Sequence, residues 1–158
     1  MSRLIKWLAL SAIVLALDLY TKQLVLQHFA YGDHFTVTSF FDLVRYHNTG
    51  AAFSFLADAG GWQQLLFGSI AVIASVIIVR LLVKHPDERL FCFALALILG
   101  GALGNLYDRL TLGYVVDFLF FHYQQYSFPA FNVADSGISV GVVLMLLDSV
   151  RKSSRKTG

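Results

Sequence analysis

Two aspartates occupy stretches of sequence that are otherwise apolar. Asp117 is the only polar residue of VVDFL (115–119), and Asp135 stands near the start of an apolar run that begins at Asn132. Ionisable groups in such surroundings are costly, so they usually face a cavity or a partner. Two carboxylates close together share one proton and can act as base and acid in amide hydrolysis. The same pair could also relay protons across a membrane, so the residues alone leave a peptidase and a transporter open.

Further polar residues fall at helical spacings around these acids. Asp18 and Lys22 are spaced i, i+4 and can pair, so a structural salt bridge and a direct role in a site are both open for them. Gly101, Asn105 and Arg109 follow one another at intervals of four and form one polar, small-residue stripe. Near the end of this run, Asp108 is expected to be either solvated or bonded to a neighbouring helix.

Glycine pairs predict that two apolar runs pack closely. Gly100 and Gly104 make one GxxxG seam, and Gly137 and Gly141 make another on the later run. Tight packing there would bring Asn105 near Asp135.

Other chemistries find little support. No His-Glu-x-x-His or comparable pair of metal ligands occurs, and the single cysteine, Cys92, excludes an internal disulfide. We therefore expect no metal and no organic cofactor. The remaining polar candidates lack a base at a telling spacing and are interpreted as structural: His47, Ser54, His122 and Ser136.

The composition indicates a membrane protein. Hydrophobic residues make up 57% of the chain and charged residues 14%, whereas soluble domains carry about a quarter charged. A fold of 158 residues could not bury so much apolar surface in water. The net charge of +2 does not suggest a nucleic acid partner.

Four stretches are long enough to cross a bilayer as helices. We predict a single domain, 1–158, with spans at about 4–26, 62–83, 90–106 and 132–147. The first span is expected to be an uncleaved anchor, because no small-x-small cleavage site follows it. The basic residues predict that both termini and the short 84–89 link are cytoplasmic. They cluster there, and the opposite side keeps only Lys22, Arg45 and Arg109.

The longer connections, about 27–61 and 107–131, are therefore expected to face outward. Residues 34–47 are rich in Phe, Val, Thr and Tyr, which favours short strands. The other connection is dense in aromatic residues between 118 and 128, which is typical of a segment lying in the headgroup zone. The predicted fold class is an all-α, four-helix membrane bundle with a small extracytoplasmic β-structure and an interfacial segment.

Five blocks make the chain resemble the bacterial lipoprotein signal peptidases (signal peptidase II), which are aspartyl enzymes. The blocks occur in family order and cover essentially the whole chain: DLYTK (18–22), NTGAAF (48–53), GGALGNLYDR (100–109), VDF (116–118) and FNVADS (131–136). The resemblance implies that Asp117 and Asp135 are the catalytic pair. It implies that Asp18 and Lys22 support the site, and that the remaining matched residues shape it and bind substrate: Asn48, Gly50, Asn105, Arg109 and Asn132.

The resemblance also implies the reaction and its partners. The substrates would be prolipoproteins bearing a diacylglyceryl-cysteine, cleaved on the N-terminal side of that cysteine in the bacterial inner membrane. The strand-like segment would form a cradle at the membrane surface, and globomycin would bind at the site. We expect a monomer surrounded by membrane lipids. A transporter subunit and a non-catalytic assembly factor are the competing hypotheses.

Overall fold

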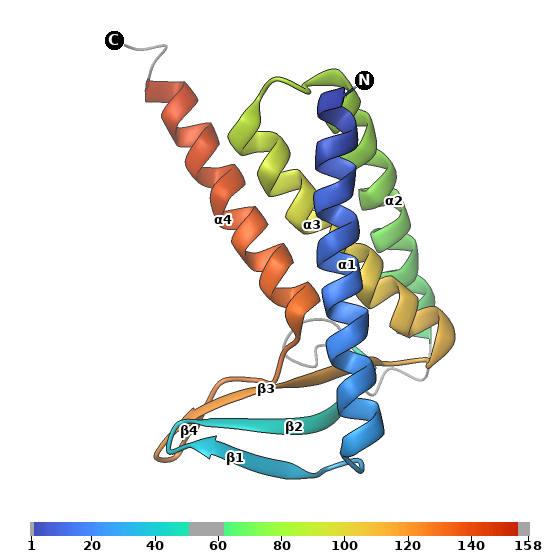
Figure 1. The fold of residues 1–158 in the computed structure, drawn as a ribbon, viewed down its shortest axis with the longest axis vertical. Coiled ribbons are helices and arrows are strands. Elements are labelled where there is room, and N and C mark those ends of the chain that lie inside the picture. Colours follow the sequence, from blue (N-terminus) through green and yellow to red (C-terminus); the bar gives the residue numbers. More distant parts are fainter. Residues whose placement is uncertain (1, 51–61, 155–158) are drawn as a thin grey trace.

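Four long helices account for most of the chain that the structure describes. The computed structural model describes residues 2–50 and 62–154. Each helix is long and apolar enough to cross a membrane, with mean hydropathies of 1.7 to 2.6. This confirms the predicted membrane bundle. The helices are α1 (Ser2–His28), α2 (Trp62–Lys84), α3 (Arg89–Thr111) and α4 (Val133–Ser154) (Figure 1).

Two helices extend well beyond the predicted membrane spans at their C-terminal ends. The helix α3 continues to Thr111 rather than 106, and α4 continues to Ser154 rather than 147. At both places polar residues end the apolar stretch. The helix continues through them, because their side chains bind other residues of the protein. Asp108 is bonded within the protein, and Lys152 pairs with Glu88 and Asp148.

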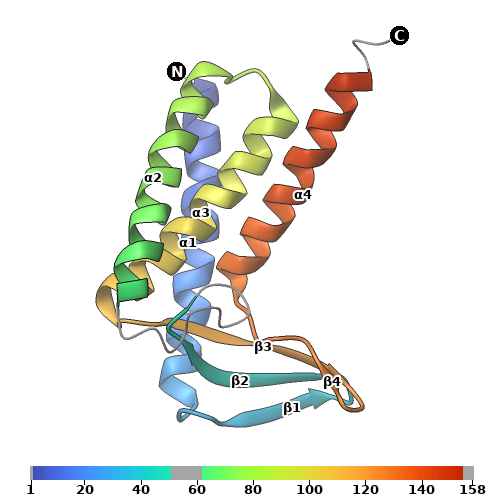
Figure 2. The same ribbon diagram turned by 180° about the vertical axis from the view of Figure 1, so that it is seen from behind.

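A small antiparallel sheet lies at one end of the bundle, at the end where α1 finishes (Figures 1 and 2). The expectation of strands in 34–47 is confirmed. Two further strands come from the second outer connection, where the sequence analysis had predicted only an interfacial segment. The strands run in the order β1 (His34–Thr38), β2 (Phe41–Asn48), β3 (Val115–Tyr123) and β4 (Tyr126–Ser127).

The pairing of β2 with β3 joins the two outer connections. Tyr46 lies opposite Asp117, and Asn48 lies opposite Val115. Val116 and Phe118 are buried in a cluster that includes Val25 of α1. Because side chains alternate along a strand, Asp117 points to the other face of the sheet. Residues 51–53 of the NTGAAF block and Ser54 lie outside the described residues.

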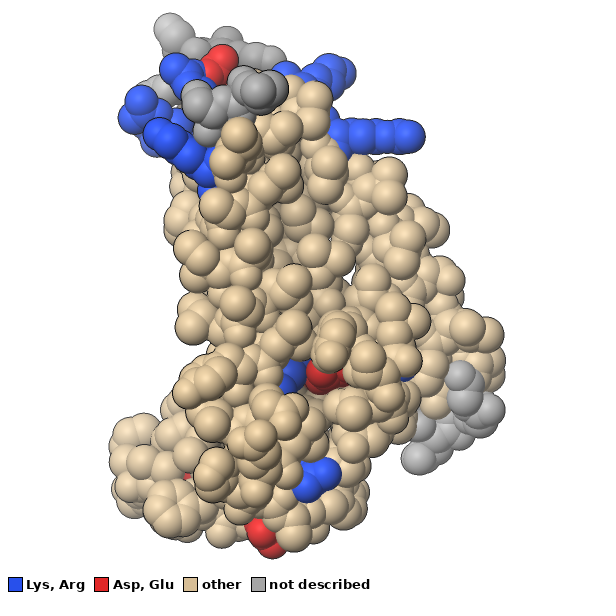
Figure 3. Space-filling model, turned by 45° about the vertical axis from the view of Figure 1, so that its right-hand side comes forward, with Lys and Arg blue, Asp and Glu red and all other residues tan. Residues whose placement is uncertain are grey.

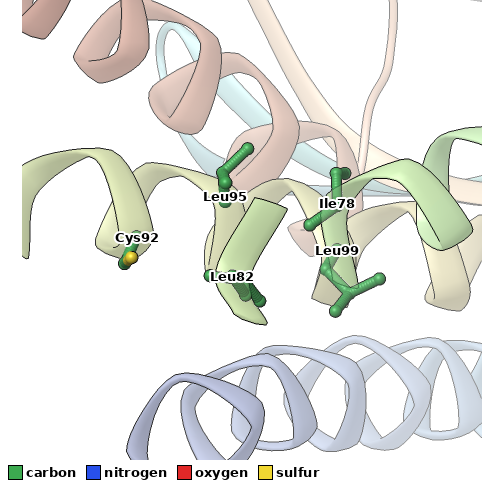
Figure 4. Packing of buried hydrophobic residues seen from close by; sticks show 5 residues of the cluster. All are labelled: Ile78, Leu82, Cys92, Leu95 and Leu99. Carbon is green, nitrogen blue, oxygen red and sulfur yellow. The ribbon is translucent and has the colours of Figure 1, made fainter. Parts of the chain in front are cut away.

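The helix α3 packs between its neighbours. Apolar residues of α2 and α3 form a buried cluster, shown in Figure 4: Ile78, Leu82, Cys92, Leu95 and Leu99. On the other side of α3, a Cβ on Gly101 would collide with the carbonyl oxygen of Ala134 in α4. A Cβ on Gly141 would lie 2.7 Å from the carbonyl oxygen of Ala94. The backbones of α3 and α4 therefore approach closely, as predicted, but on α3 the contact is made by Gly101. The predicted seam of Gly100 and Gly104 packs against α1 instead, where added Cβ atoms would meet Ser11, Val14 and Asp18.

The surface divides into a charged end and a broad uncharged zone. Lys and Arg gather at the helix ends remote from the sheet, and few charges appear along the helices (Figure 3). Large apolar side chains are exposed there, such as Leu65 and Ile73 of α2. A surface of this kind suits hydrocarbon rather than water.

Candidate active site

Asp117 is held in β3 by two side-chain amides. It is 3% exposed. Asn48 of β2 donates from Nδ2 to Oδ2 of Asp117 at 3.0 Å, and Asn132 donates from Nδ2 to Oδ1 at 2.8 Å. The other end of the Asn48 amide accepts the main-chain N–H of Gly50 at 2.9 Å. The Asn48 amide is thereby fixed with its N–H₂ toward the carboxylate.

Asp135 lies in the first turn of α4. Its Oδ1 accepts a hydrogen bond from Nδ2 of Asn105 at 2.8 Å, so Asn105 and Asp135 lie near each other, as predicted. Its own main-chain N–H donates to Oδ1 of Asn132 at 2.8 Å, and the N–H of Asn132 returns to Oδ2 of Asp135 at 3.3 Å. This reciprocal pair is a capping box, which both begins the helix and orients Asp135.

Asn132 therefore connects the two acids. Its Nδ2 contacts Asp117 while its Oδ1 accepts from the main chain of Asp135, and the side chain is fully buried. A second, weaker bond runs from Nδ2 of Asn132 to Oδ1 of Asn105 at 3.3 Å. Asn105, Asp117 and the pair of Asn132 and Asp135 come from three separate blocks of the sequence, and the structure brings them into one hydrogen-bonded network.

The network places Asp117 in an environment that favours its protonated form. Burial and, after it, the negative charge of Asp135 raise the pKa of Asp117 to about 7. The amides of Asn48 and Asn132 and the charge of Lys22 oppose this rise. A carboxyl group with such a pKa can hold a proton near neutral pH and exchange it with a reacting group.

Arg109 binds main-chain carbonyl groups and makes no ion pair with either acid. Its Nη2 donates to the carbonyl oxygen of Gly50 at 2.8 Å, and its Nη1 donates to that of Asn105 at 3.2 Å. The guanidinium also lies over the ring of Phe67, 5.5 Å from its centroid. Its Nε is buried without a hydrogen-bond partner in the described part of the chain. Arg109 and Asn48 thus hold Gly50 from both sides.

Asp18 and Lys22 form the ion pair that their spacing allowed. Nζ of Lys22 lies 2.7 Å from Oδ2 of Asp18, and both side chains are almost fully buried. The same Nζ donates to Oδ1 of Asn105 at 2.9 Å, which links the pair to the residue that holds Asp135.

Asp108 is the residue whose part the sequence analysis left undecided. Of its two options, solvation is wrong, because Asp108 is 3% exposed and lies 3.0 Å from Nζ of Lys22. Its spacing from Asn105, i, i+3, puts both on one face of α3, and that spacing was the available signal.

Comparisons with known proteins agree with this site. The chain matches the family model for signal peptidase (SPase) II over residues 10–151. It is 56% identical to the lipoprotein signal peptidase of Ralstonia nicotianae over 149 residues, which cover 94% of this chain and 86% of the relative. The lipoprotein signal peptidase of Cupriavidus necator is 50% identical over 149 residues, covering 94% and 85%.

A solved structure shares the fold. A bacterial membrane enzyme determined by the in meso method at 2.3 Å resolution superposes with a TM-score of 0.86 at 30% identity. The superposition covers 96% of this chain and 91% of that one. The family model, the relatives and the solved structure each cover nearly the whole chain, and the chain belongs to the signal peptidase II family of signal-peptide-cleaving proteases in the bacterial inner membrane.

Proposed function

We propose that the chain is an aspartyl endopeptidase whose catalytic pair is Asp117 and Asp135. The observation that supports it is the bridge through Asn132, which joins the buried Asp117, whose pKa is about 7, to the half-buried Asp135. The family match favours this peptidase over the transporter subunit that two membrane-depth acids alone left open.

The pair supplies both proton transfers of amide hydrolysis. In the proposed resting state Asp117 carries the shared proton and Asp135 is ionised. Asp135 takes a proton from water, and the resulting hydroxide attacks the scissile carbonyl carbon while Asp117 polarises the carbonyl oxygen. As the C–N bond breaks, Asp117 gives its proton to the leaving amine. The dyad then holds one proton again, on the opposite residue, so atoms and charges balance.

The proposed substrate is a prolipoprotein cut on the N-terminal side of its diacylglyceryl-modified cysteine. Asp117 lies in β3 of the sheet and Asp135 at the start of α4, at the end of the bundle remote from the basic helix ends (Figures 1 and 3). By the positive-inside rule we expect those basic ends to be cytoplasmic. Lipid chains would hold the cysteine at the outer interface, where the acids are proposed to lie. Diffusion in the membrane plane and fixed orientation then favour the reaction.

Three residues around the acids are proposed to receive the substrate main chain. The buried Nε of Arg109 is a donor suited to a substrate carbonyl group, and Gly50 presents main chain beside it. Asn48 holds Asp117 from the side of β2. We propose that a monomer carries the complete site and that globomycin competes with substrate for it.

The test is cleavage of a diacylglyceryl-modified prolipoprotein by the purified protein in detergent. Asp117→Asn and Asp135→Asn should each abolish signal-peptide release while remaining folded. Asp87→Asn, at an exposed ion pair with Arg3 at the basic end, is the control and should cleave normally. Cleavage that survives either substitution at the dyad would remove that residue from the mechanism.

A further inference from the structure

Each catalytic aspartate is preceded by a residue whose main-chain N–H is bound by another, buried acid. Val116, directly before Asp117, donates its N–H to Oδ2 of Asp108 at 3.0 Å. Ala134, directly before Asp135, donates its N–H to Oδ1 of Asp18 at 2.8 Å. The two contacts tie β3 to α3 and the start of α4 to α1.

Lys22 joins these two acids. Its Nζ lies 2.7 Å from Asp18, 3.0 Å from Asp108 and 2.9 Å from Oδ1 of Asn105. An ammonium group has three N–H donors, and three acceptor oxygens surround this one. The ion cluster of Asp18, Lys22 and Asp108 is thus fully enclosed: the lysine is 2% exposed and neither acid more than 3%.

A buried ion cluster is poor evidence of stability, because removing charges from water costs as much as their attraction returns. The surrounding chain nevertheless makes room for this one. A Cβ on Gly104 of α3 would collide with Oδ2 of Asp18, so glycine is needed where the helix passes the cluster. The position and contacts of the ion cluster, rather than its contribution to stability, indicate its role.

We infer that Asp18, Lys22 and Asp108 are positioning residues that fix the separation of the two catalytic carboxyl groups. One lysine holds two acids, and each acid holds the main chain one residue ahead of a catalytic aspartate. A shift of β3 against α4 would have to break the cluster. The inference rests on the proposed function, since it assigns Asp117 and Asp135 the chemistry.

Lys22 has a second, electrostatic effect. Its charge opposes the rise in the pKa of Asp117 that burial and Asp135 produce. Arg109 of α3 also interacts electrostatically with Asp117, and Asn48 of β2 and Asn132 contribute neutral amides. Asp18 of α1 and Asp108 of α3 face Lys22. Loss of the lysine charge should therefore raise the pKa of Asp117 further.

The first test compares Asp108→Asn with Asp108→Leu. Asparagine keeps an oxygen for the N–H of Val116, whereas leucine of similar size does not. We expect Asp108→Asn to stay within about threefold of the wild-type kcat and folded Asp108→Leu to lose at least about thirtyfold, with KM little changed in both. Equal kcat values in the wild type and folded Asp108→Leu would overturn the inference.

The second test is the double variant Asp18→Asn with Lys22→Gln. It keeps the net charge of the cluster at −1, because one positive and one negative charge disappear together, and it keeps an acceptor for the N–H of Ala134. We expect a large loss of kcat and a shift of the alkaline limb of the pH–kcat profile upward by about half a pH unit. Misfolding lowers the amount of active enzyme but does not move that limb. An unshifted profile with normal kcat overturns the inference, and either test alone suffices to do so.

The other end of the bundle supplies the matched control. Lys152 there also lies between two acids, Glu88 and Asp148. Lys152→Met should leave kcat and the pH profile unchanged. Asp117→Asn and Asp135→Asn are measured alongside. If they still cleave, the proposed dyad fails; if they are inactive while the cluster variants match the wild type, only the positioning role fails.

Discussion

Asn132 serves two purposes with one side chain. Its amide oxygen caps the main chain of α4 at Asp135, and its amide nitrogen holds the carboxylate of Asp117. The cap stabilises the start of α4, whereas the contact with Asp117 serves the proposed chemistry. A suitable substitution at Asn132 can remove one effect and keep the other.

Asn132→Ser should lose activity while keeping most of its stability. Serine caps helices about as well as asparagine, so the free energy of unfolding should change by less than about 1 kcal/mol. The serine hydroxyl is too short to reach Asp117, so kcat/KM should fall at least about tenfold. Asn132→Ala, which also loses the cap, is the comparison and should melt at a lower temperature. Unchanged cleavage by Asn132→Ser would show that the bridge does not matter.

Asp117→Asn should change how the stability of the protein depends on pH. The pKa of Asp117 is raised in the folded protein to about 7, so its protonated form stabilises the fold below the ordinary carboxyl pKa. That stabilisation is lost as the pH rises through about 7. Asparagine does not ionise, so the free energy of unfolding of the variant should rise relative to that of the wild type as the pH increases from 4 to 7, by at most about 4 kcal/mol. Above pH 7 the difference between the two proteins should stay constant.

Thermal melts of both proteins across this range test the prediction. Titrating groups remote from Asp117 are common to the two proteins and cancel in the difference, whereas Asp135 is coupled to Asp117 and belongs to the effect. A difference in melting temperature that is constant from pH 4 to pH 8 would contradict a raised pKa at this residue.

The helices α3 and α4 position Asn105 against Asp135 through their glycine contact. Gly101→Ala should force the backbones apart at Ala134, next to the catalytic residue, because the new Cβ would collide with that carbonyl group. We expect a lower melting temperature and at least about a tenfold loss of kcat. Gly68→Ala is the matched control, since its Cβ would meet Leu106 at an ordinary 3.8 Å. Equal losses of melting temperature and kcat in Gly101→Ala and Gly68→Ala would argue against the close contact of α3 with α4.

The two outer connections show where sequence patterns stop being informative. Richness in Phe, Val, Thr and Tyr predicted strands in 34–47, but the dense aromatic residues from 118 onward suit an interfacial segment equally well. Its pairing with β2 is set by contacts between segments about 70 residues apart, for which a single sequence carries no signal. The register that sets Asp117 opposite Tyr46 was therefore beyond prediction.

The candidate site was likewise predictable only in part. The motifs pointed to the side chains that hydrogen-bond around the two acids, namely Asn48, Asn105 and Asn132, but not to Asp108. The i, i+4 spacing allowed the pair of Asp18 and Lys22. The main-chain bonds from Val116 and Ala134 were not predictable, because main-chain donors leave no mark in residue type.

On the scale of the whole molecule, the charge distribution predicts a topology that can be measured. Tyr126 lies on the sheet and is exposed, whereas Arg151 lies near the end of α4. Each is replaced in its own variant, Tyr126→Cys and Arg151→Cys. In intact spheroplasts a membrane-impermeant maleimide should label the first and not the second. The native Cys92 is buried and should stay unlabelled. Labelling of Arg151→Cys alone would invert the proposed orientation.

The capping box of α4 also bears on when the enzyme becomes active. Asn132 and Asp135 stand at the start of α4, which is synthesised after α1, α2 and α3, and the bond that starts this helix is the one that orients the proposed site. A ribosome that has made only α1, α2 and α3 has therefore not yet made the proposed catalytic pair. Under the proposed mechanism, cleavage awaits the insertion of α4.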